Sequence, residues 1–330
     1  MIKIIDSTLC MLNDYPLTKE QIKCFISFVG NVGIKDLQIN PLIYEMLEGE
    51  LPEGFVYYLE LGTMTYMRGN YPIDDKIKYY FTPKRSTLPN EIETHQLNDI
   101  TEPTDFHIDN RLIKIVGLDS LLLNGCDGAV IWFQKKIPVK TTILCPENTY
   151  HCATATALLF LEQKGYGVVT TFSGIGNKAA TEQIIMALHV SERYMNNKLF
   201  PDFANIKIWL EEIVGIKIPS FAPVIGDRIF HVESGVHVDG IMKKPANYEP
   251  YPPEEVGLKR KVILGKYSGK NSVMIKLQKL GYNEYTEKDA EKLLKIIKQK
   301  SVLEGTAVSD SEFTKIVEGY DCHEKTTKNS

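Results

Sequence analysis

The stretch TTILCPENTYHCATATALLFLEQKGYGVVTTF, residues 141–172, decides the fold class. Its first and last parts, TTILC and GVVTTF, are short β-branched runs of the kind that form buried strands. Between them lies ATATALLFLEQKG, an alanine-rich segment that predicts a helix ending at Gly165. A strand, a helix and a second strand in this order predict a βαβ unit, whose two strands are parallel.

The same alternation extends toward the N-terminus. Residues 2–9 (IKIIDSTL), 36–39 (DLQI) and 54–61 (GFVYYLEL) are predicted strands. Thr18 as an N-cap and Gly33 as a stop delimit a predicted helix between the first two of them. The repetition predicts a parallel sheet, closed into an eight-fold barrel or open and doubly wound.

The alternation recurs in one further segment and is lost in another. AVIWF at 129–133 is predicted as a strand, preceded by a helix over residues 110–125. Residues 75–108 carry no clear period, so periodicity alone does not count eight strands.

Composition describes an ordinary globular protein. Of 330 residues, 43% are hydrophobic and 24% charged, and the formal net charge of -4 argues against binding the phosphate backbone of nucleic acids. The six cysteines form no CxxC pair and are expected to be reduced. The opening run has no signal-peptide pattern and no stretch has the length of a membrane span, so we expect a cytoplasmic protein.

The character of the sequence changes near residue 218. Proline-rich and glycine-rich segments follow, and then two basic amphipathic helices are predicted at 272–281 and 287–305. We expect a first domain over residues 1–218, and over residues 219–330 a linker with a small helical subdomain.

Residues 231–240 (HVESGVHVDG) are polar and glycine-punctuated, which is typical of a functional loop. His237 is the candidate for proton transfer, and Tyr248 is its candidate hydroxyl partner. The alternative is that His237 only caps or bridges the backbone of the loop.

Residues 233–273 (ESGVHVDGIMKKPANYEPYPPEEVGLKRKVILGKYSGKNSV) closely resemble the linker region of homocitrate synthases and isopropylmalate synthases, and residues 248–260 favour the former. Residues 170–189 resemble the seventh-strand region of the same family. The resemblance implies a (β/α)8 TIM barrel rather than an open sheet. It also implies a divalent metal at the carboxyl ends of the strands and condensation of acetyl-CoA with a 2-oxo acid. Lys266 and Tyr267, in the KYSG run at 266–269, match a family segment without suggesting a role.

The sequence departs from the family at the metal ligands. Met11 stands where the family has an aspartate, and Cys145 and Glu147 stand where it has a His-x-His pair. Thr181 replaces an asparagine that completes the metal shell in relatives. Methionine does not replace a carboxylate on a hard divalent ion, so the comparison implies that this barrel binds no metal and is inactive. The alternative is a self-sufficient acyltransferase with a remodelled zinc site at Cys145 and Glu147.

The linker is retained although the metal ligands are lost. In the family, the residues corresponding to His237 and Tyr248 reach into the active site of a neighbouring subunit. The chain therefore resembles the omega-type subunit of a split homocitrate synthase of nitrogen fixation. Its alpha-type partner would bind the divalent metal, 2-oxoglutarate and acetyl-CoA. A regulatory or scaffolding paralogue is the non-catalytic alternative.

Overall fold

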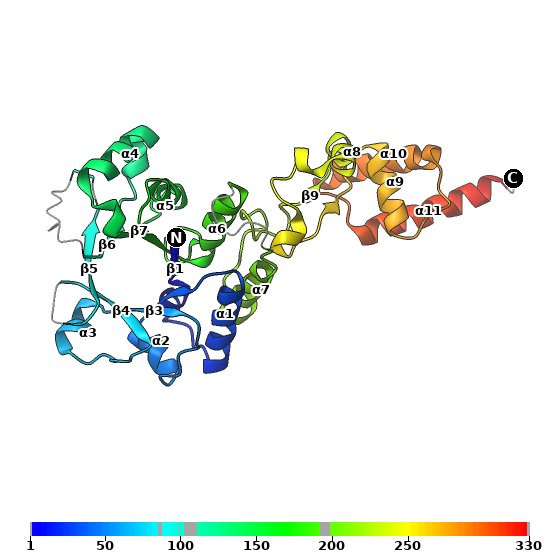
Figure 1. Ribbon diagram of the computed structural model, residues 1–330. Coiled ribbons are helices and arrows are strands. Elements are labelled where there is room, and N and C mark those ends of the chain that lie inside the picture. Colours follow the sequence, from blue (N-terminus) through cyan, green and yellow to red (C-terminus); the bar gives the residue numbers. More distant parts are fainter. Residues whose placement is uncertain (1, 85–87, 99, 102–110, 192–198, 329–330) are drawn as a thin grey trace. The chain divides into compact units, whose positions relative to one another are not determined.

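The computed structural model describes residues 2–84, 88–98, 100–101, 111–191 and 199–328. The chain forms two compact units, Met1–Gly226 and Asp227–Ser330 (Figure 1). The sequence analysis placed the domain boundary after residue 218. Each unit has its own core and is described by itself.

The first unit is a closed barrel of eight parallel strands. The strands are β1 (Lys3–Asp6), β2 (Asp36–Ile39), β3 (Val56–Glu60), β4 (Ile77–Thr82), β5 (Glu91–Leu97), β6 (Ile113–Gly117), β7 (Thr142–Pro146) and β8 (Gly167–Thr170). β8 closes the barrel on β1, with Lys3 opposite Gly167 and Asp6 opposite Thr170. The closed sheet confirms the predicted TIM barrel and excludes the open doubly wound sheet.

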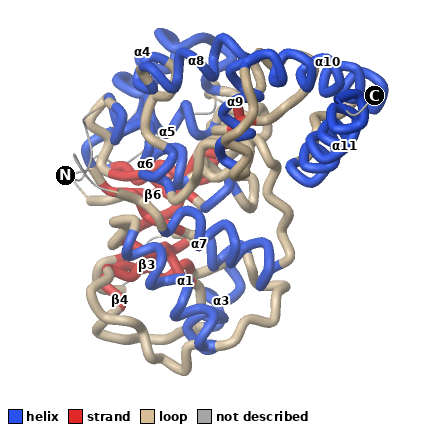
Figure 2. Tube along the Cα trace, turned by 90° about the vertical axis from the view of Figure 1, so that its right-hand side faces the viewer, coloured by secondary structure: helices blue, strands red, loops and turns tan. Residues whose placement is uncertain are grey.

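Helices alternate with the strands and lie outside the barrel (Figure 2). They are α1 (Lys19–Asn31), α2 (Pro41–Met46), α3 (Thr63–Arg68), α4 (Gly125–Lys136), α5 (Ala153–Glu162), α6 (Thr181–Val190) and α7 (Asp202–Trp209). Shorter helical turns are η1 (Thr8–Met11), η2 (Leu121–Asn124), η3 (Val139–Thr141), η4 (Phe172–Gly174) and η5 (Leu210–Val214).

The first helix begins and ends as predicted. The hydroxyl of Thr18 accepts a hydrogen bond from the backbone N–H of Gln21, and the Gln21 side chain accepts one from the backbone of Thr18. This reciprocal capping box satisfies two backbone donors that a helix otherwise leaves free. Gly33, just after the helix, has a φ of 94°, which glycine adopts without a steric penalty.

The predicted strand at 129–133 was wrong, because this segment lies in α4. Ala129, Trp132 and Phe133 are its buried residues, at spacings of three and four that belong to a helix. The preceding segment, predicted as a helix, contains β6 instead. Five-residue apolar runs fit either state, and here the tertiary packing decides.

The unassigned segment at 75–108 contains β4 and β5, and residues 85–87, 99 and 102–108 of it lie outside the described residues. The run at 170–189 follows β8, so its predicted place at the seventh strand was wrong by one strand.

The second unit is a small helical domain. It contains α8 (Gly235–Lys243), α9 (Lys270–Lys279), α10 (Glu287–Glu304), α11 (Asp310–Lys328), and the short turns η6 (Pro245–Asn247) and η7 (Pro253–Val256). β9 (His231–Val232) and β10 (Lys261–Val262) pair in parallel. The two predicted basic helices are therefore confirmed as α9 and α10.

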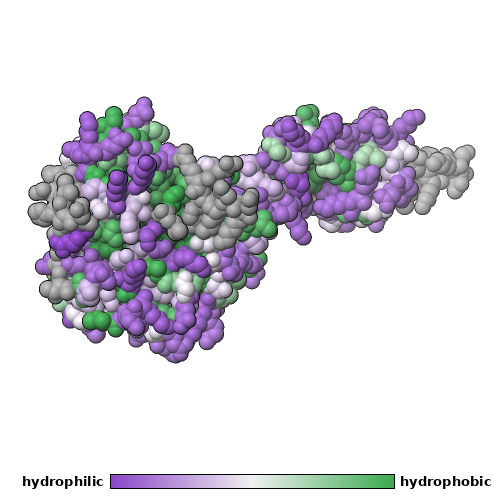
Figure 3. All heavy atoms as spheres, in the orientation of Figure 1, coloured by the Kyte–Doolittle hydropathy of each residue, from purple (hydrophilic) through white to green (hydrophobic). Residues whose placement is uncertain are grey.

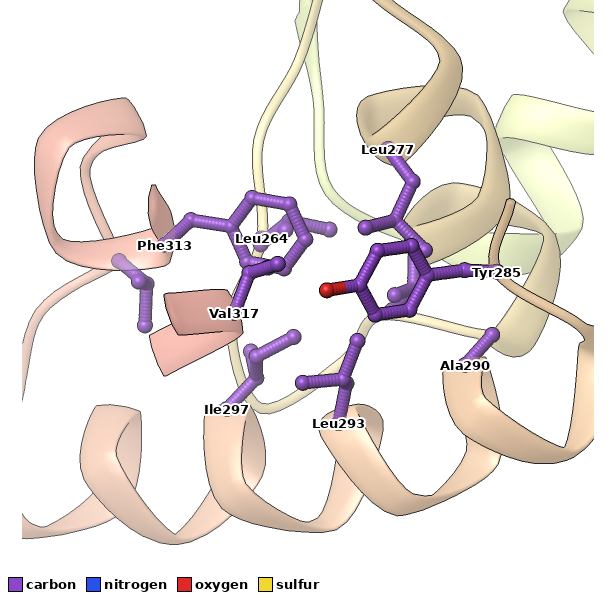
Figure 4. Packing of buried hydrophobic residues seen from close by; sticks show 10 residues of the cluster. Leu264, Leu277, Tyr285, Ala290, Leu293, Ile297, Phe313 and Val317 are labelled. Atoms are coloured by element: carbon purple, nitrogen blue, oxygen red, sulfur yellow. The ribbon is translucent and has the colours of Figure 1, made fainter. Parts of the chain in front are cut away.

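Side chains from α9, α10 and α11 enclose the core of this unit (Figure 4). Leu277, Leu293, Ile297 and Phe313 are fully buried in it. The visible outer face of the unit is mainly hydrophilic (Figure 3) and carries ion pairs such as Lys270 with Glu287. The lysine-rich helices are thus amphipathic elements with a solvated face.

We expect Leu293→Ala to lower the free energy of unfolding of the second unit by about 2–5 kcal/mol, because it leaves a cavity among fully buried neighbours. Leu303→Ala on the same helix is the control, since Leu303 is 85% exposed and should change the value by less than about 0.5 kcal/mol. Urea denaturation followed by circular dichroism measures both. Equal losses for the two variants would contradict the observed packing of α10.

Candidate functional sites in the barrel mouth and on helix α8

A cavity of about 570 Å³ opens at the carboxyl ends of the barrel strands. Its walls include Ser7 after β1, Gln38 on β2, Glu60 on β3 and Cys145 on β7. The loops and strand ends at this face of a TIM barrel carry the active sites of such enzymes. The cavity is therefore the first candidate site.

A buried lysine lies inside this cavity. Lys114 on β6 is only 2% exposed, and its ammonium group donates to Gln38 Oε1 at 3.3 Å and pairs with the carboxylate of Glu60. The same ammonium lies 4.2 Å from the centroid of the Phe81 ring. Removing a charge this deep from water is costly unless partners surround it, and these three groups provide them.

Two of the positions predicted to have lost metal ligands line the cavity, Met11 and Cys145. Burial raises the pKa of the Cys145 thiol, so the thiol stays protonated at neutral pH. The neighbouring Cys10 thiol is also buried, its pKa is raised, and it donates to the backbone oxygen of Gln38 at 3.3 Å. A metal binds the thiolate form, and burial favours the neutral form of these two thiols as long as no metal is present.

The other two positions have oxygen atoms that are engaged elsewhere. Glu147 accepts a hydrogen bond from the ammonium group of Lys178 at 3.0 Å. The hydroxyl of Thr181 donates to Asp6 Oδ2 at 2.9 Å and lies 2.7 Å from the hydroxyl of Thr170. The ammonium of Lys178 also faces the cavity.

These residues do not fit a hard divalent cation. Such an ion prefers carboxylate, carbonyl and water oxygens, whereas the four positions of the expected ligands carry a thioether, a buried thiol, a carboxylate paired with Lys178 and a hydroxyl that donates to Asp6. Within the described ranges, no three His, Cys, Asp or Glu side chains are grouped so as to hold a metal.

We expect chelation to leave the stability of this chain unchanged. A specifically bound ion at 100 times its dissociation constant would add about 2.7 kcal/mol to the free energy of unfolding. Incubation with EDTA, or addition of Mn²⁺ or Zn²⁺, should therefore shift the thermal midpoint by less than about 1 °C, because the mouth lacks a suitable donor set. A midpoint that falls with EDTA and returns with one metal would contradict this reading of the cavity.

Asp6, at the end of β1, connects the segment after β1 with the segment after β8, where the barrel closes. Its carboxylate accepts from the backbone N–H of Thr8 at 3.1 Å and from the hydroxyls of Thr8 and Thr181 at 3.0 and 2.9 Å. Burial raises the pKa of Asp6 to about 7, although the three hydrogen bonds lower it. Burial likewise raises the pKa of Glu182 on α6 to about 7.

Asp6 makes the stability of the barrel depend on pH. Between about pH 4 and pH 7 the folded chain holds a proton on Asp6 that the unfolded chain has released. The contribution of Asp6 to the free energy of unfolding therefore falls as pH rises through this range and is constant above pH 7. We expect the free energy of unfolding of the wild type, relative to Asp6→Asn, to decrease from pH 5 to pH 7.5. Urea denaturation at several pH values measures this difference, and a difference that rises with pH would contradict a raised pKa.

The second candidate site is the pair His237 and Tyr248, which the fold brings together on the second unit. Their ring centroids are 5.8 Å apart. His237 is exposed in the first turn of α8, and Tyr248 is 46% exposed after η6. Tyr248 packs over Gly240, where a Cβ atom would lie 2.2 Å from the tyrosine hydroxyl. A side chain at 240 would therefore displace the Tyr248 ring from this position.

The predicted loop around His237 was wrong, because residues 235–243 form α8. Gly235 and Gly240 each disfavour a helix by about 1 kcal/mol relative to alanine, which is why the segment has the composition of a loop. The tertiary contacts of the two glycines outweigh that preference, since each is packed against another part of the chain.

Comparison with known proteins tests the resemblance that the sequence predicted. Residues 224–303 match the family described as homocitrate synthase post-HMGL domain-like. The chain is 28% identical to the homocitrate synthase omega subunit of Clostridium pasteurianum over 321 residues, which cover 91% of this chain and 90% of that protein. The chain is thus similar to homocitrate synthases, and to that omega subunit over most of its length. The predicted resemblance is thereby confirmed.

A shorter match links this chain to homocitrate synthase AksA of Methanocaldococcus jannaschii, with 36% identity over 179 residues. That match covers 52% of this chain and 42% of AksA, so it spans less than half of the relative. Among solved structures, hydroxymethylglutaryl-CoA lyase from Pseudomonas aeruginosa aligns with a TM-score of 0.47 and 9% identity, over 65% of this chain and 93% of that one. The barrel assignment rests on the strand pairing described above.

The sequence analysis missed the polar interior of the barrel mouth. Lys114, Glu60 and Lys178 were not singled out, although a lysine in the otherwise apolar strand IKIVG is a signal. A charged residue inside a buried strand requires a partner, and finding that partner would have pointed to the cavity.

No described helix has both the length and the apolar character that crossing a membrane would require.

Proposed function

We propose that this chain is one subunit of a hetero-oligomeric homocitrate synthase, and that it donates His237 and Tyr248 to the active site of a partner. The partner is an alpha-type barrel subunit that holds the divalent metal, 2-oxoglutarate and acetyl-CoA. The complex works in the cytoplasm and supplies homocitrate for nitrogen fixation. The proposal rests on the exposed pair of an imidazole and a phenol. It is found in a chain whose own barrel mouth does not fit a metal.

The geometry of the barrel supports an inactive mouth. The carboxylates of Glu60 and Glu147 are each paired with a lysine ammonium, so neither is free to coordinate a cation. Cys145 and Glu147, the residues of the alternative zinc site, are respectively a buried thiol with a raised pKa and a partner of Lys178. These contacts argue against a self-sufficient acyltransferase.

The chemistry supports a role for the donated pair. Homocitrate forms when the methyl group of acetyl-CoA loses a proton and its carbon bonds to the carbonyl carbon of 2-oxoglutarate. Water then cleaves the thioester and releases CoA. Each step moves protons near the thioester oxygen, the methyl group or the new alkoxide, and an imidazole beside a phenol supplies suitable donors and acceptors.

The exposure of His237 and Tyr248 is consistent with donation in trans. A proton-transfer group must come within about 3 Å of its target, so an active-site group is accessible to its substrate. In the second unit the pair lies on the surface of α8 and the following turn, where a second subunit can cover it.

We expect homocitrate to form only when this chain is mixed with its alpha-type partner. In that mixture His237→Ala should lower kcat by about 10²–10⁴-fold, the usual contribution of a positioned acid or base. His151→Asn is the control, because His151 is an exposed barrel histidine at a φ of 58° that asparagine tolerates. Release of CoA measures the rate.

Three other results would each contradict part of the proposal. Activity of this chain alone would mean that its barrel is competent. Full activity of the His237→Ala mixture would favour the scaffolding paralogue, in which the linker serves assembly only. An unchanged rate of the partner with and without this chain would exclude the split enzyme.

A further inference from the structure

The KYSG run at 266–269, to which the sequence assigned no role, packs against residues 233–235 at the start of α8. The backbone N–H of Tyr267 donates to Glu233 Oε1 at 3.0 Å, and the backbone N–H of Gly235 donates to the carbonyl oxygen of Tyr267 at 3.4 Å. These contacts join two segments that are more than thirty residues apart in the chain.

A buried hydroxyl completes the junction. Ser268 is 2% exposed, and its Oγ accepts from the backbone N–H of Gly265 at 2.9 Å. The hydroxyl proton faces two backbone oxygens at 3.3 Å, those of Glu233 and Ile263. The serine thus connects β10, the KYSG run and the residue that precedes the N-cap of α8.

Two glycines bring the backbones into contact. A Cβ atom on Gly235 would lie 2.7 Å from Cα and N of Gly269, and a Cβ on Gly265 would lie 2.4 Å from Glu233 Oε1. Because Gly235 faces backbone atoms that cannot move aside, a side chain at 235 would push the two segments apart, whereas a side chain at 265 would displace the Glu233 carboxylate. Gly235 is the first residue of α8, and His237 lies two residues further along in the same turn.

We infer that Glu233, Gly235, Ser268 and Gly269, together the α8 anchor, are positioning residues that set the direction of the His237 imidazole. Glu233 acts as a hydrogen-bond acceptor for the backbone of Tyr267 and transfers no proton. The side chain of Tyr267 is not part of the anchor, since it is 65% exposed and contacts the ammonium of Lys266 at 4.6 Å from the ring centroid. The inference rests on the proposed role of His237.

The anchor matters because α8 is weakly specified by its own sequence. Its N-cap, Ser234, makes no side-chain hydrogen bond to the first turn, and the helix contains two glycines. Without the anchor, the first turn would fray and the imidazole would sample several directions. A misplacement of about 1 Å at a catalytic group can cost about 100-fold in rate.

The test compares Glu233→Ala with Glu233→Gln, and Ser268→Ala with Ser272→Ala. Glutamine keeps the Oε1 acceptor and removes the charge, so it separates positioning from proton transfer. Ser272 is the matched control, because its hydroxyl is also fully buried near the start of α9 and has no hydrogen-bond partner. Each variant is measured as the full chain, alone and mixed with the partner subunit.

Two readouts are used. In the chain alone, NMR follows the His237 imidazole resonances and the hydrogen exchange of the α8 amides. In the mixture, kcat and the KM for 2-oxoglutarate are measured. We expect Ser268→Ala and Glu233→Ala to shift the imidazole resonances, speed α8 exchange at least about 10-fold and lower kcat about 10- to 100-fold, with KM unchanged because the partner binds that substrate. Glu233→Gln and Ser272→Ala should match the wild type in every readout.

Loss of activity in Glu233→Gln with unchanged His237 resonances would overturn the inference, since it would make Glu233 a proton-transfer group. Wild-type resonances and kcat in Ser268→Ala would also overturn it. If Ser268→Ala does not fold, the comparison of Glu233→Ala with Glu233→Gln still decides the question, because Glu233 is partly exposed. A fully active His237→Ala mixture together with shifted resonances in Ser268→Ala would overturn the proposed function and leave the anchor as an element of structure only.

Discussion

The pairing of the last barrel strand with the first is the constraint on which the first unit depends. Four residues of β1 lie opposite four residues of β8, and the backbone N–H of Ser7 continues the ladder to the carbonyl oxygen of Thr170 at 2.8 Å. Side chains extend the same junction, because the Thr8 hydroxyl accepts from the backbone N–H of Phe172 at 2.8 Å while Asp6 accepts from Thr181. Closing the ring in this way brings eight strand ends to one mouth.

The charges inside that mouth are balanced by partners within the chain. Lysine ammonium groups at 114 and 178 neutralise carboxylates that could otherwise serve as ligands. Each pair satisfies its own charges without a bound ion, and replacing only one partner would leave the other charge unpaired inside the cavity. The architecture of the barrel therefore does not require a bound ion to balance these charges.

In the second unit, close backbone contacts take the place of side-chain packing around the candidate catalytic pair. Gly235 contacts Gly269, and Gly240 lies under the ring of Tyr248. Each glycine weakens α8 as an isolated helix, yet each permits a contact that fixes α8 in the folded chain. Glycines that make the isolated helix flexible thus allow the close contacts that hold His237 and Tyr248 in place in the folded chain.

The sequence by itself determined the features that depend on local pattern. The capping box at Thr18, the strand at residues 36–39 and the alternation around α5 follow from period and end signals, and the ordered match around residues 233–273 gave the resemblance to homocitrate synthases. Only the tertiary structure decided that residues 129–133 are helical and that Lys114 meets Glu60, 54 residues away. A short apolar run fits either a strand or a helix, so packing decides between them. Residues that are far apart in the chain produce no periodic pattern in the sequence, so their contact is also known only from the packed structure.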